Sequence, residues 1–211
     1  MKAVLQVFCV MMSLAAGAMA QLPDRSHSVS LDVNVVSSGG TVSQKGKSLG
    51  GGGTDTEGGH YYSSTSVSST TQARSTEVHI VVRNFRNTPD TVTLEWYFIG
   101  ADVKNSKKFI FDSGSQSLAL NAGEQREQNQ RSKELAQVTS RATTTYGALN
   151  SDVEYLPSTI STESGKKPKG WIVRLVAGDS VLDAKTSSTS FDEAARNFKS
   201  PQDLAKWVQM H

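Results

Sequence analysis

Much of the chain from Ser28 onward shows the two-residue alternation of apolar and polar positions that is typical of β-strands. The first such segment, Ser28 to Val36, places valines and Leu31 on one face. Two further segments, 76–85 and 91–99, alternate in the same way, and the residues between them have the composition of a turn. The pattern therefore predicts that 76–85 and 91–99 are adjacent antiparallel strands.

A second hairpin is predicted near the C-terminal end. Apolar residues alternate from Trp171 to Leu175, a turn-like stretch covers 177–180, and 181–185 returns. Short strands at this spacing, without helices between them, favour a mostly β fold, an immunoglobulin-like antiparallel β-sandwich. We expect Trp96 and Trp171 to be buried between its two sheets.

The hydrophobic period changes to that of helices near the end of the chain. Ser190 and Glu193 have the spacing of a capping box, and Ser200-Pro201 has the composition of a helix start. Residues 189–211 are therefore expected to form two short amphipathic helices. We expect them to pack on the sandwich, because short isolated helices are marginal in water; docking to a partner is the alternative.

Three segments depart from this alternation. Residues 37–60 are rich in glycine, serine and threonine, and we expect them to form a mobile loop, because they have little apolar area to bury. Residues 61–75 are polar on both faces and are expected to extend the strand that starts at Thr76. Within 124–150, the polar stretch from Gln125 to Lys133 fits a helix or an edge strand equally well.

The N-terminus has the pattern of a secretory signal peptide. Lys2 precedes the apolar run 3–16, and Ala18-Met19-Ala20 forms a small-residue cleavage site before Gln21. The expected organisation is a signal peptide at 1–20, a sandwich over 21–188 and helices over 189–211. We expect an exported protein of the periplasm, outer membrane or cell surface of a bacterium, with no transmembrane helix after cleavage.

Composition narrows the chemistry that such a mature protein could perform. Its formal net charge is close to zero, which gives no reason to expect a nucleic-acid partner. The only cysteine, Cys9, lies in the predicted signal peptide, so no disulfide or thiolate site is expected. The four histidines have no metal-binding spacing. Accordingly, no cofactor and no metal are predicted.

No catalytic residue is predicted either. The chain lacks the G-x-S-x-G motif of serine hydrolases. Asp55 with Glu57, and Asp152 with Glu154, are paired carboxylates of the kind that glycosidases use, but both pairs lie in polar, loop-like sequence. We therefore expect a protein that is not an enzyme.

Exposed aromatic residues offer a different kind of site. Tyr61 and Tyr62 lie in polar surroundings, where their rings could stack on sugars. Tyrosines at the fringe of a core look the same in sequence, because the ring has both an apolar body and a polar tip. Tyr61 and Tyr62 are the candidate ligand-binding residues.

Two strand pairs carry a family resemblance. TEVHIVVRNFRNTPDTVTLEWYFIG (76–100) and KGWIVRLVAGDSVLDAKTSS (169–188) resemble small secreted immunoglobulin-like proteins of Verrucomicrobia from a type IV pilus-associated gene region. The resemblance covers roughly 76–211. It implies an immunoglobulin-like fold and association with the outer membrane or a pilus, and it implies no catalytic residues. The chain lacks the long, retained apolar N-terminal helix of a pilin subunit.

Together these observations predict an exported, non-enzymatic immunoglobulin-like protein of the bacterial envelope, either pilus-associated or adhesive. Its expected partner is an envelope or pilus protein. The alternative is a carbohydrate-binding module that recognises mucin glycans through Tyr61 and Tyr62.

Overall fold

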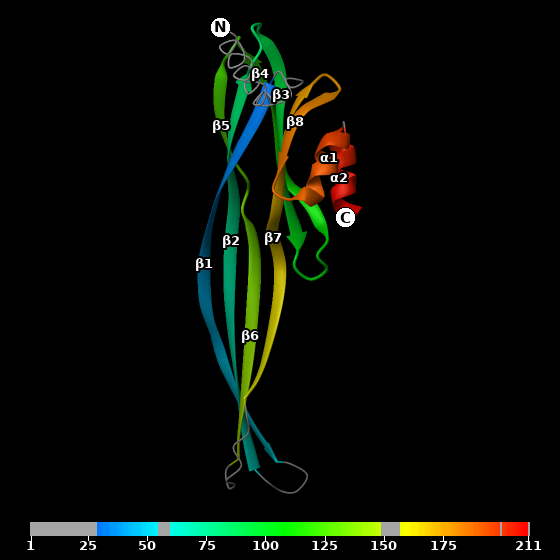
Figure 1. Cartoon of the computed structure of the whole chain (residues 1–211). Coiled ribbons are helices and arrows are strands. Elements are labelled where there is room, and N and C mark those ends of the chain that lie inside the picture. The colour runs from blue at the N-terminus through cyan, green and yellow to red at the C-terminus, as the bar shows by residue number, and fades with distance from the viewer. Residues whose placement is uncertain (1–28, 55–59, 149–156, 199, 211) are drawn as a thin grey trace, which may run out of the picture.

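A computed structural model describes residues 29–54, 60–148, 157–198 and 200–210. The molecule is elongated, with a two-sheet sandwich at one end and a long, narrow sheet at the other (Figure 1). In chain order the strands are β1 (Val29–Thr54), β2 (His60–Asn84), β3 (Asp90–Asp102), β4 (Lys108–Leu120), β5 (Gln125–Arg131), β6 (Leu135–Ala148), β7 (Ser158–Ala177) and β8 (Ser180–Thr186). A 3₁₀ turn, η1 (Thr189–Phe191), precedes the helices α1 (Asp192–Asn197) and α2 (Pro201–Met210).

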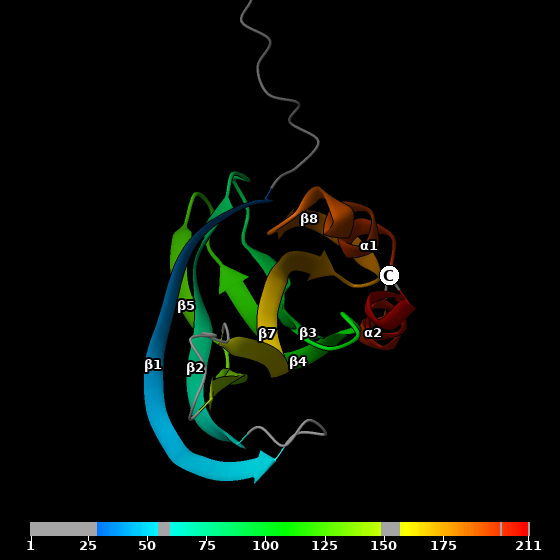
Figure 2. The ribbon, with the colours of Figure 1, turned by 90° about the horizontal axis from the view of Figure 1, so that it is seen from below.

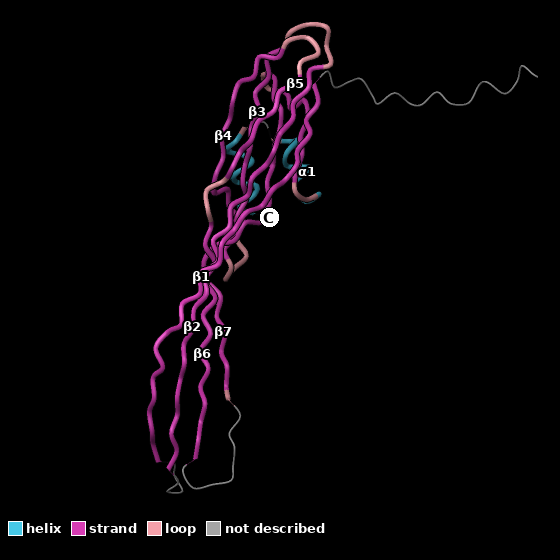
Figure 3. The backbone as a smooth tube through the Cα atoms, turned by 90° about the vertical axis from the view of Figure 1, so that its left-hand side faces the viewer, coloured by secondary structure: helices cyan, strands magenta, loops and turns pink. Residues whose placement is uncertain are grey.

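The narrow end is a four-stranded antiparallel sheet in the order β1-β2-β6-β7, which we call the blade. Toward the other end the same strands separate into two layers. One layer contains β1, β2 and β5, and the other contains β4, β3, β7 and β8. Figure 3 shows the blade strands continuing into the sandwich. The predicted mostly β sandwich with a short C-terminal helical segment is confirmed.

One glycine lets β7 belong to both sheets. Up to Gly165 the strand pairs with β6, and from Lys166 onward it pairs with β3. Gly165 has a φ of 98°, and a Cβ atom there would lie 2.4 Å from the carbonyl oxygen of Ala136. Only glycine adopts this backbone conformation without strain, and only glycine fits in this space. The strand therefore leaves one sheet and joins the other at this residue. Figure 2 shows the curved course of β7.

The space between the two sheets holds the main core. Its buried members come from five strands: Val29, Leu31, Val78, Ile80, Val82, Val92, Leu94, Phe98, Leu118, Leu120, Trp171, Val173 and Leu175. Trp171 is buried as predicted, whereas Trp96 is only partly buried at the margin of this core. Trp96 packs over Gly114, where an added Cβ would lie 2.3 Å from the indole ring.

The helices cover the outer face of the second sheet. Their buried residues pack on that sheet in a second apolar cluster: Tyr97, Ile99, Ile172, Ala184, Phe191, Ala194, Ala195, Leu204 and Val208. The prediction that the helices pack on the sandwich is confirmed. Ser200 caps α2 as predicted, because its hydroxyl accepts the amide of Asp203 at 3.1 Å. The prediction of a Ser190–Glu193 capping box is wrong, because Ser188 caps the 3₁₀ turn and α1 begins only at Asp192.

The predicted pairing of 76–85 with 91–99 is also wrong. These segments lie in β2 and β3, which belong to different sheets and face each other across the core. Buried Asn84 organises the crossing between them, donating to the carbonyl oxygens of Thr88 and Asn121, both at 3.0 Å. Alternation shows that a strand has a buried face, but it does not show whether the next strand lies beside it or opposite it. The predicted β7–β8 hairpin is confirmed, with a two-residue turn at Gly178-Asp179.

The glycine-rich segment is the largest difference from expectation. Residues 37–54, expected to be a mobile loop within 37–60, continue β1 and pair with β2 to the end of the strand, whereas 55–59 lie outside the described residues. The expectation rested on the lack of apolar area to bury. A strand within a sheet is also held by its backbone hydrogen bonds, to which glycine and serine contribute like other residues.

Two other expectations concern polar segments. Residues 61–75 extend the strand as predicted. Of the two structures left open for 125–133, the edge strand is present as β5, which among the described strands pairs with β2 alone. Between β5 and β6 the chain continues along the same side of β2. There, buried Ser132 bonds to Thr76 through its hydroxyl at 2.9 Å and its amide at 2.8 Å.

Candidate anion-binding site

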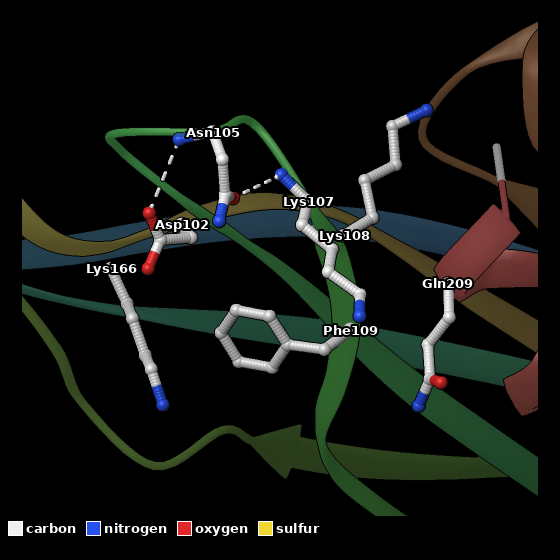
Figure 4. A pocket seen from close by; sticks show the side chains of 7 residues that line it. All are labelled: Asp102, Asn105, Lys107, Lys108, Phe109, Lys166 and Gln209. Carbon is white, nitrogen blue, oxygen red and sulfur yellow. Dashed lines mark hydrogen bonds between the residues drawn. The ribbon is translucent and has the colours of Figure 1, made fainter.

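A pocket of about 280 Å³ lies near the junction of blade and sandwich (Figure 4). It is lined by residues from the end of β3, the β3–β4 turn, β4, β7 and the end of α2: Asp102, Asn105, Lys107, Lys108, Phe109, Lys166 and Gln209. Three lysines thus line the pocket together with one carboxylate, two amides and one aromatic ring, and the ammonium group of one of them, Lys108, lies toward Phe191. This composition attracts anions and offers both donors and acceptors to a ligand.

Local hydrogen bonds shape the turn between β3 and β4. Asp102 Oδ1 accepts the backbone amides of Lys104 at 2.8 Å and Asn105 at 3.3 Å. Asn105 Oδ1 in turn accepts the amide of Lys107 at 2.9 Å. Ser106 adopts a φ of 57° at this turn, where short polar residues that bond to the backbone are favoured. The hydrogen bonds of this turn therefore hold the backbone of Lys107 at the pocket, and they do not involve the Lys107 side chain.

The strand switch at Gly165 brings the other lysine into place. Lys166 is the first residue of β7 to pair with β3, and its register partner is Asp102. The amide of Val103 donates to the carbonyl oxygen of Gly165 at 3.0 Å, which joins the turn to the switch. Residues more than sixty positions apart in sequence therefore meet at one pocket.

Phe109 forms the apolar part of the lining. Lys166 Nζ lies 4.8 Å from the centre of its ring, which is cation–π distance. Gly100 leaves space for this ring, because a Cβ there would lie 3.0 Å from Phe109 Cζ. The nearby ammonium of Lys108 lies 5.4 Å from the ring of Phe191.

Positive charge is concentrated around this pocket. The two short segments 102–108 and 166–169 contain six lysines and one acidic residue, although the whole chain has a formal net charge of only +2. Sequence reasoning missed the cluster because it considered the charge balance of the whole chain. The signals were the two lysine-rich runs, KNSKK and KKPK, which only the fold brings together.

The tyrosines singled out from sequence lie elsewhere. Tyr61 and Tyr62 belong to the start of β2 in the blade, where their backbones pair with Ala148 and Gly147 of β6. Their side chains are outside the described part of the structure, as are Asp55, Glu57, Asp152 and Glu154. Tyr146, one residue from Gly147, has an exposed side chain.

His79, the one histidine that the sequence places within a predicted strand, contacts neighbouring polar side chains of β5. His79 Nδ1 lies 2.8 Å from Asn129 Oδ1, and His79 Nε2 lies 3.7 Å from a carboxylate oxygen of Glu127. Among the described residues, no group of three or more histidine, cysteine or acidic side chains could hold a metal ion. No helix in the described ranges is long and apolar enough to cross a membrane.

A buried polar cluster fastens the helices to the sheet. Arg174 of β7 is fully buried and donates from Nε to Glu95 Oε2 at 2.5 Å. The same guanidinium donates to the carbonyl oxygen of Phe198, between the two helices. The hydroxyl of Tyr97 donates to Glu95 Oε2 at 2.8 Å. Burial, partly offset by the nearby Arg174 charge, raises the pKa of Tyr97 well above its usual range.

Comparison with known proteins gives no family. No protein-family model matches the chain, and no curated protein is significantly similar to it in sequence. Among solved structures, the chain is similar to an X-ray structure of Northeast Structural Genomics Consortium target SoR45, with a TM-score of 0.26 and 10% sequence identity. The similarity covers 69% of this chain and 86% of that chain. A similarity this weak supports no inference about function, which must come from the chain's own residues.

Proposed function

We propose that the chain is an exported, non-enzymatic immunoglobulin-like protein of the bacterial envelope, and that it is adhesive. In this proposal the lysine-lined pocket binds acidic glycans, such as the sulfated or sialylated chains of mucin. The observation that supports it is that three lysines are among the seven residues lining the pocket, with Lys166 over the ring of Phe109, in a chain that is otherwise nearly neutral. The export part of the proposal is supported by the signal-peptide pattern of residues 1–20, which lie outside the described structure.

The lining favours an acidic sugar over a nucleic acid. Lysine ammonium groups attract a carboxylate or sulfate group. The amides of Asn105 and Gln209 can bond to sugar hydroxyls, and Phe109 offers an apolar surface to a sugar ring. Asp102 adds a carboxylate. Its Oδ1 accepts the amides of the turn, and its Oδ2 accepts no hydrogen bond from the described residues, so Oδ2 can accept a hydrogen bond from a sugar hydroxyl. The same carboxylate would repel a polyphosphate backbone.

The test is binding of the purified protein to immobilised mucin. Native mucin should retain the protein, and enzymatic removal of sialic acid and sulfate should weaken binding at least about tenfold. The double variant Lys107→Glu/Lys166→Glu should lose binding to a similar extent, because it reverses the charge of two of the three lysines that line the pocket. The matched control is Lys185→Glu, which reverses an exposed lysine on β8, a strand that contributes nothing to the pocket lining.

Two results would count against the proposal. Equal binding to desialylated, desulfated mucin would show that the acidic groups are not recognised. Equally tight binding to single-stranded DNA would indicate general attraction to polyanions. In either case the pilus-associated role would become the leading hypothesis, and cross-linking in intact cell envelopes would identify the protein partner.

A further inference from the structure

The outer edge of β1 is an unpaired strand edge. β1 pairs with β2 along its length, and no described strand pairs with its other edge, although β8 lies beside the first residues of β1. The amide of Leu31 points outward, because it donates to the side chain of Asp183 on β8 at 3.0 Å. Backbone groups alternate sides along a strand, and the register with β2 is unbroken as far as Lys45. The odd-numbered residues from 33 to 43 therefore present their N–H and C=O groups outward.

This edge lacks the features that usually prevent strands from pairing. Natural edges are protected by charged residues, proline, bulges or short length. β5 is such an edge, since it has seven residues, two of them arginine and one glutamate. In contrast, residues 33–43 of β1 contain no charged residue and no proline, and the register shift comes only after Lys45. Val36 and Val42, on one face of this edge, are 59% and 63% exposed.

We propose that the β1 edge binds the β1 edge of a second copy of this chain, antiparallel, about a two-fold axis at Gly39. Gly39 is an outward-facing residue, so this register pairs outward residues with outward residues, for example 37 with 41 and 35 with 43. Between 35 and 43 it forms about ten backbone hydrogen bonds, because each hydrogen-bonded pair exchanges two. The two blades become one continuous sheet with β1 of each copy at its centre.

The arrangement of side chains indicates a second copy as the partner. Val36 and Val42 lie three residues on either side of Gly39. The two-fold axis therefore places Val36 of each copy opposite Val42 of the other copy, which gives two Val36–Val42 pairs. The residues between them are serine, glycine and threonine, which leave room for close approach. The uncharged edge also lets two identical strands meet without like-charge repulsion. A two-fold contact of this kind closes on itself and forms a dimer.

The oligomeric state of the full chain provides the first test, by sedimentation across a range of concentrations. We expect a reversible dimer. Thr41→Pro should yield a monomer, because proline removes an outward N–H that β2 does not use. Thr41→Val keeps the N–H group and should remain dimeric, so it is the matched control. A wild-type chain that is monomeric at every concentration, or a Thr41→Pro variant that still dimerises, would overturn the proposal.

Introduced cysteines test the register itself. In a Cys9→Ser background the chain has no other cysteine, so Val36→Cys and Val42→Cys can be prepared as separate proteins. Facing residues of a non-hydrogen-bonded pair have Cα atoms about 4.5 Å apart, within the range of a disulfide. A mixture of the two variants should therefore form a disulfide-linked dimer on mild oxidation.

Neither variant should form this dimer alone. In the proposed register two copies of residue 36 are separated by six positions along the strands, about 20 Å. A disulfide-linked dimer of either variant alone would contradict the pairing centred on Gly39. So would a mixture of the two variants that dimerises but does not cross-link. The edge lies apart from the lysine-lined pocket in sequence and uses none of its residues, so this test and the mucin test can fail independently.

Discussion

The buried hydroxyl of Tyr97 links the packing of the helices to pH. It lies on the face of β3 that meets α1 and α2, beside Glu95 and Arg174. Ionising this phenol would place a second negative charge next to the Glu95 carboxylate, away from water. The folded state therefore holds the phenolic proton more tightly than the unfolded state does, because burial raises the pKa of Tyr97.

The sign of the pH effect follows from this difference. Below about pH 10 the phenol is protonated in both states, so its contribution to stability does not change. Above that pH the unfolded chain releases its proton while the folded chain keeps it, so the free energy of unfolding falls. We expect urea midpoints to decrease between pH 9 and 11 more in the wild-type chain than in Tyr97→Phe. Parallel decreases in both proteins would contradict this prediction, since the other tyrosines and lysines are common to both.

Arg174 illustrates why a buried charged residue is hard to predict from the pattern of apolar and polar positions. In sequence it interrupts an apolar run, as an outward-facing residue of an edge strand would. In the structure it is fully buried, and its guanidinium binds both the sheet and the backbone between the two helices. Its partners lie about eighty positions upstream and about twenty downstream, so no local pattern indicates them.

At the scale of elements, β7 determines how the blade and the sandwich are joined. It is one uninterrupted strand from Ser158 to Ala177, but its two halves belong to different sheets. The change of sheet occurs at Gly165, just before the lysine-rich run that contributes Lys166 to the pocket. The glycine thus determines both the architecture and the position of the candidate site.

Gly165→Ala tests this function of the glycine. Alanine would introduce backbone strain and a clash with the carbonyl oxygen of Ala136, so we expect a loss of about 3 kcal/mol in the free energy of unfolding. Gly178→Ala is the matched control, because Gly178 also has a positive φ but an added Cβ there would meet no atom within 4 Å. That variant should lose only about 1 kcal/mol. Chemical denaturation measures both, and similar losses would show that the close approach at Gly165 is unimportant.

Across the whole molecule, stability should be unevenly distributed. The sandwich contains both apolar clusters, whereas the blade is held by backbone pairing and by polar contacts between strands. Examples of those contacts are Thr65 Oγ1 to Thr144 Oγ1 at 3.0 Å and Thr143 Oγ1 to Thr159 Oγ1 at 3.2 Å. Segments with few buried apolar contacts open locally at lower free energy than a core does.

Hydrogen–deuterium exchange can measure this difference. Amides of the blade, in 63–73 and 138–146, should exchange at least about tenfold faster than those in 78–82 and 171–176, a difference of about 1.4 kcal/mol in opening free energy. The experiment should use the Thr41→Pro variant, so that pairing of β1 edges does not add protection. Uniform protection of blade and sandwich would show that the molecule opens as one cooperative unit.

The amino-acid sequence alone determined those features that depend on near neighbours in the chain. The alternation of apolar residues predicted strands at 28–36, 76–85, 91–99 and 171–175, and the change of period predicted the two helices. The turn at Gly178-Asp179 joins adjacent strands, so the β7–β8 hairpin could also be predicted. These features follow from the geometry of a strand or helix and the burial of its apolar side.

Tertiary structure alone decided which strands are neighbours and which polar residues meet. The same alternation fits strands that lie beside each other and strands that lie opposite each other, which is why β2 and β3 were placed wrongly. The segment 37–54 becomes a strand because β2 satisfies its backbone, not because of its own composition. The lysine-lined pocket exists only because Gly165 directs β7 toward β3 and brings Lys166 beside the turn that holds Lys107. Contacts between distant residues leave no periodic signal in a sequence, because they depend on how the complete chain packs.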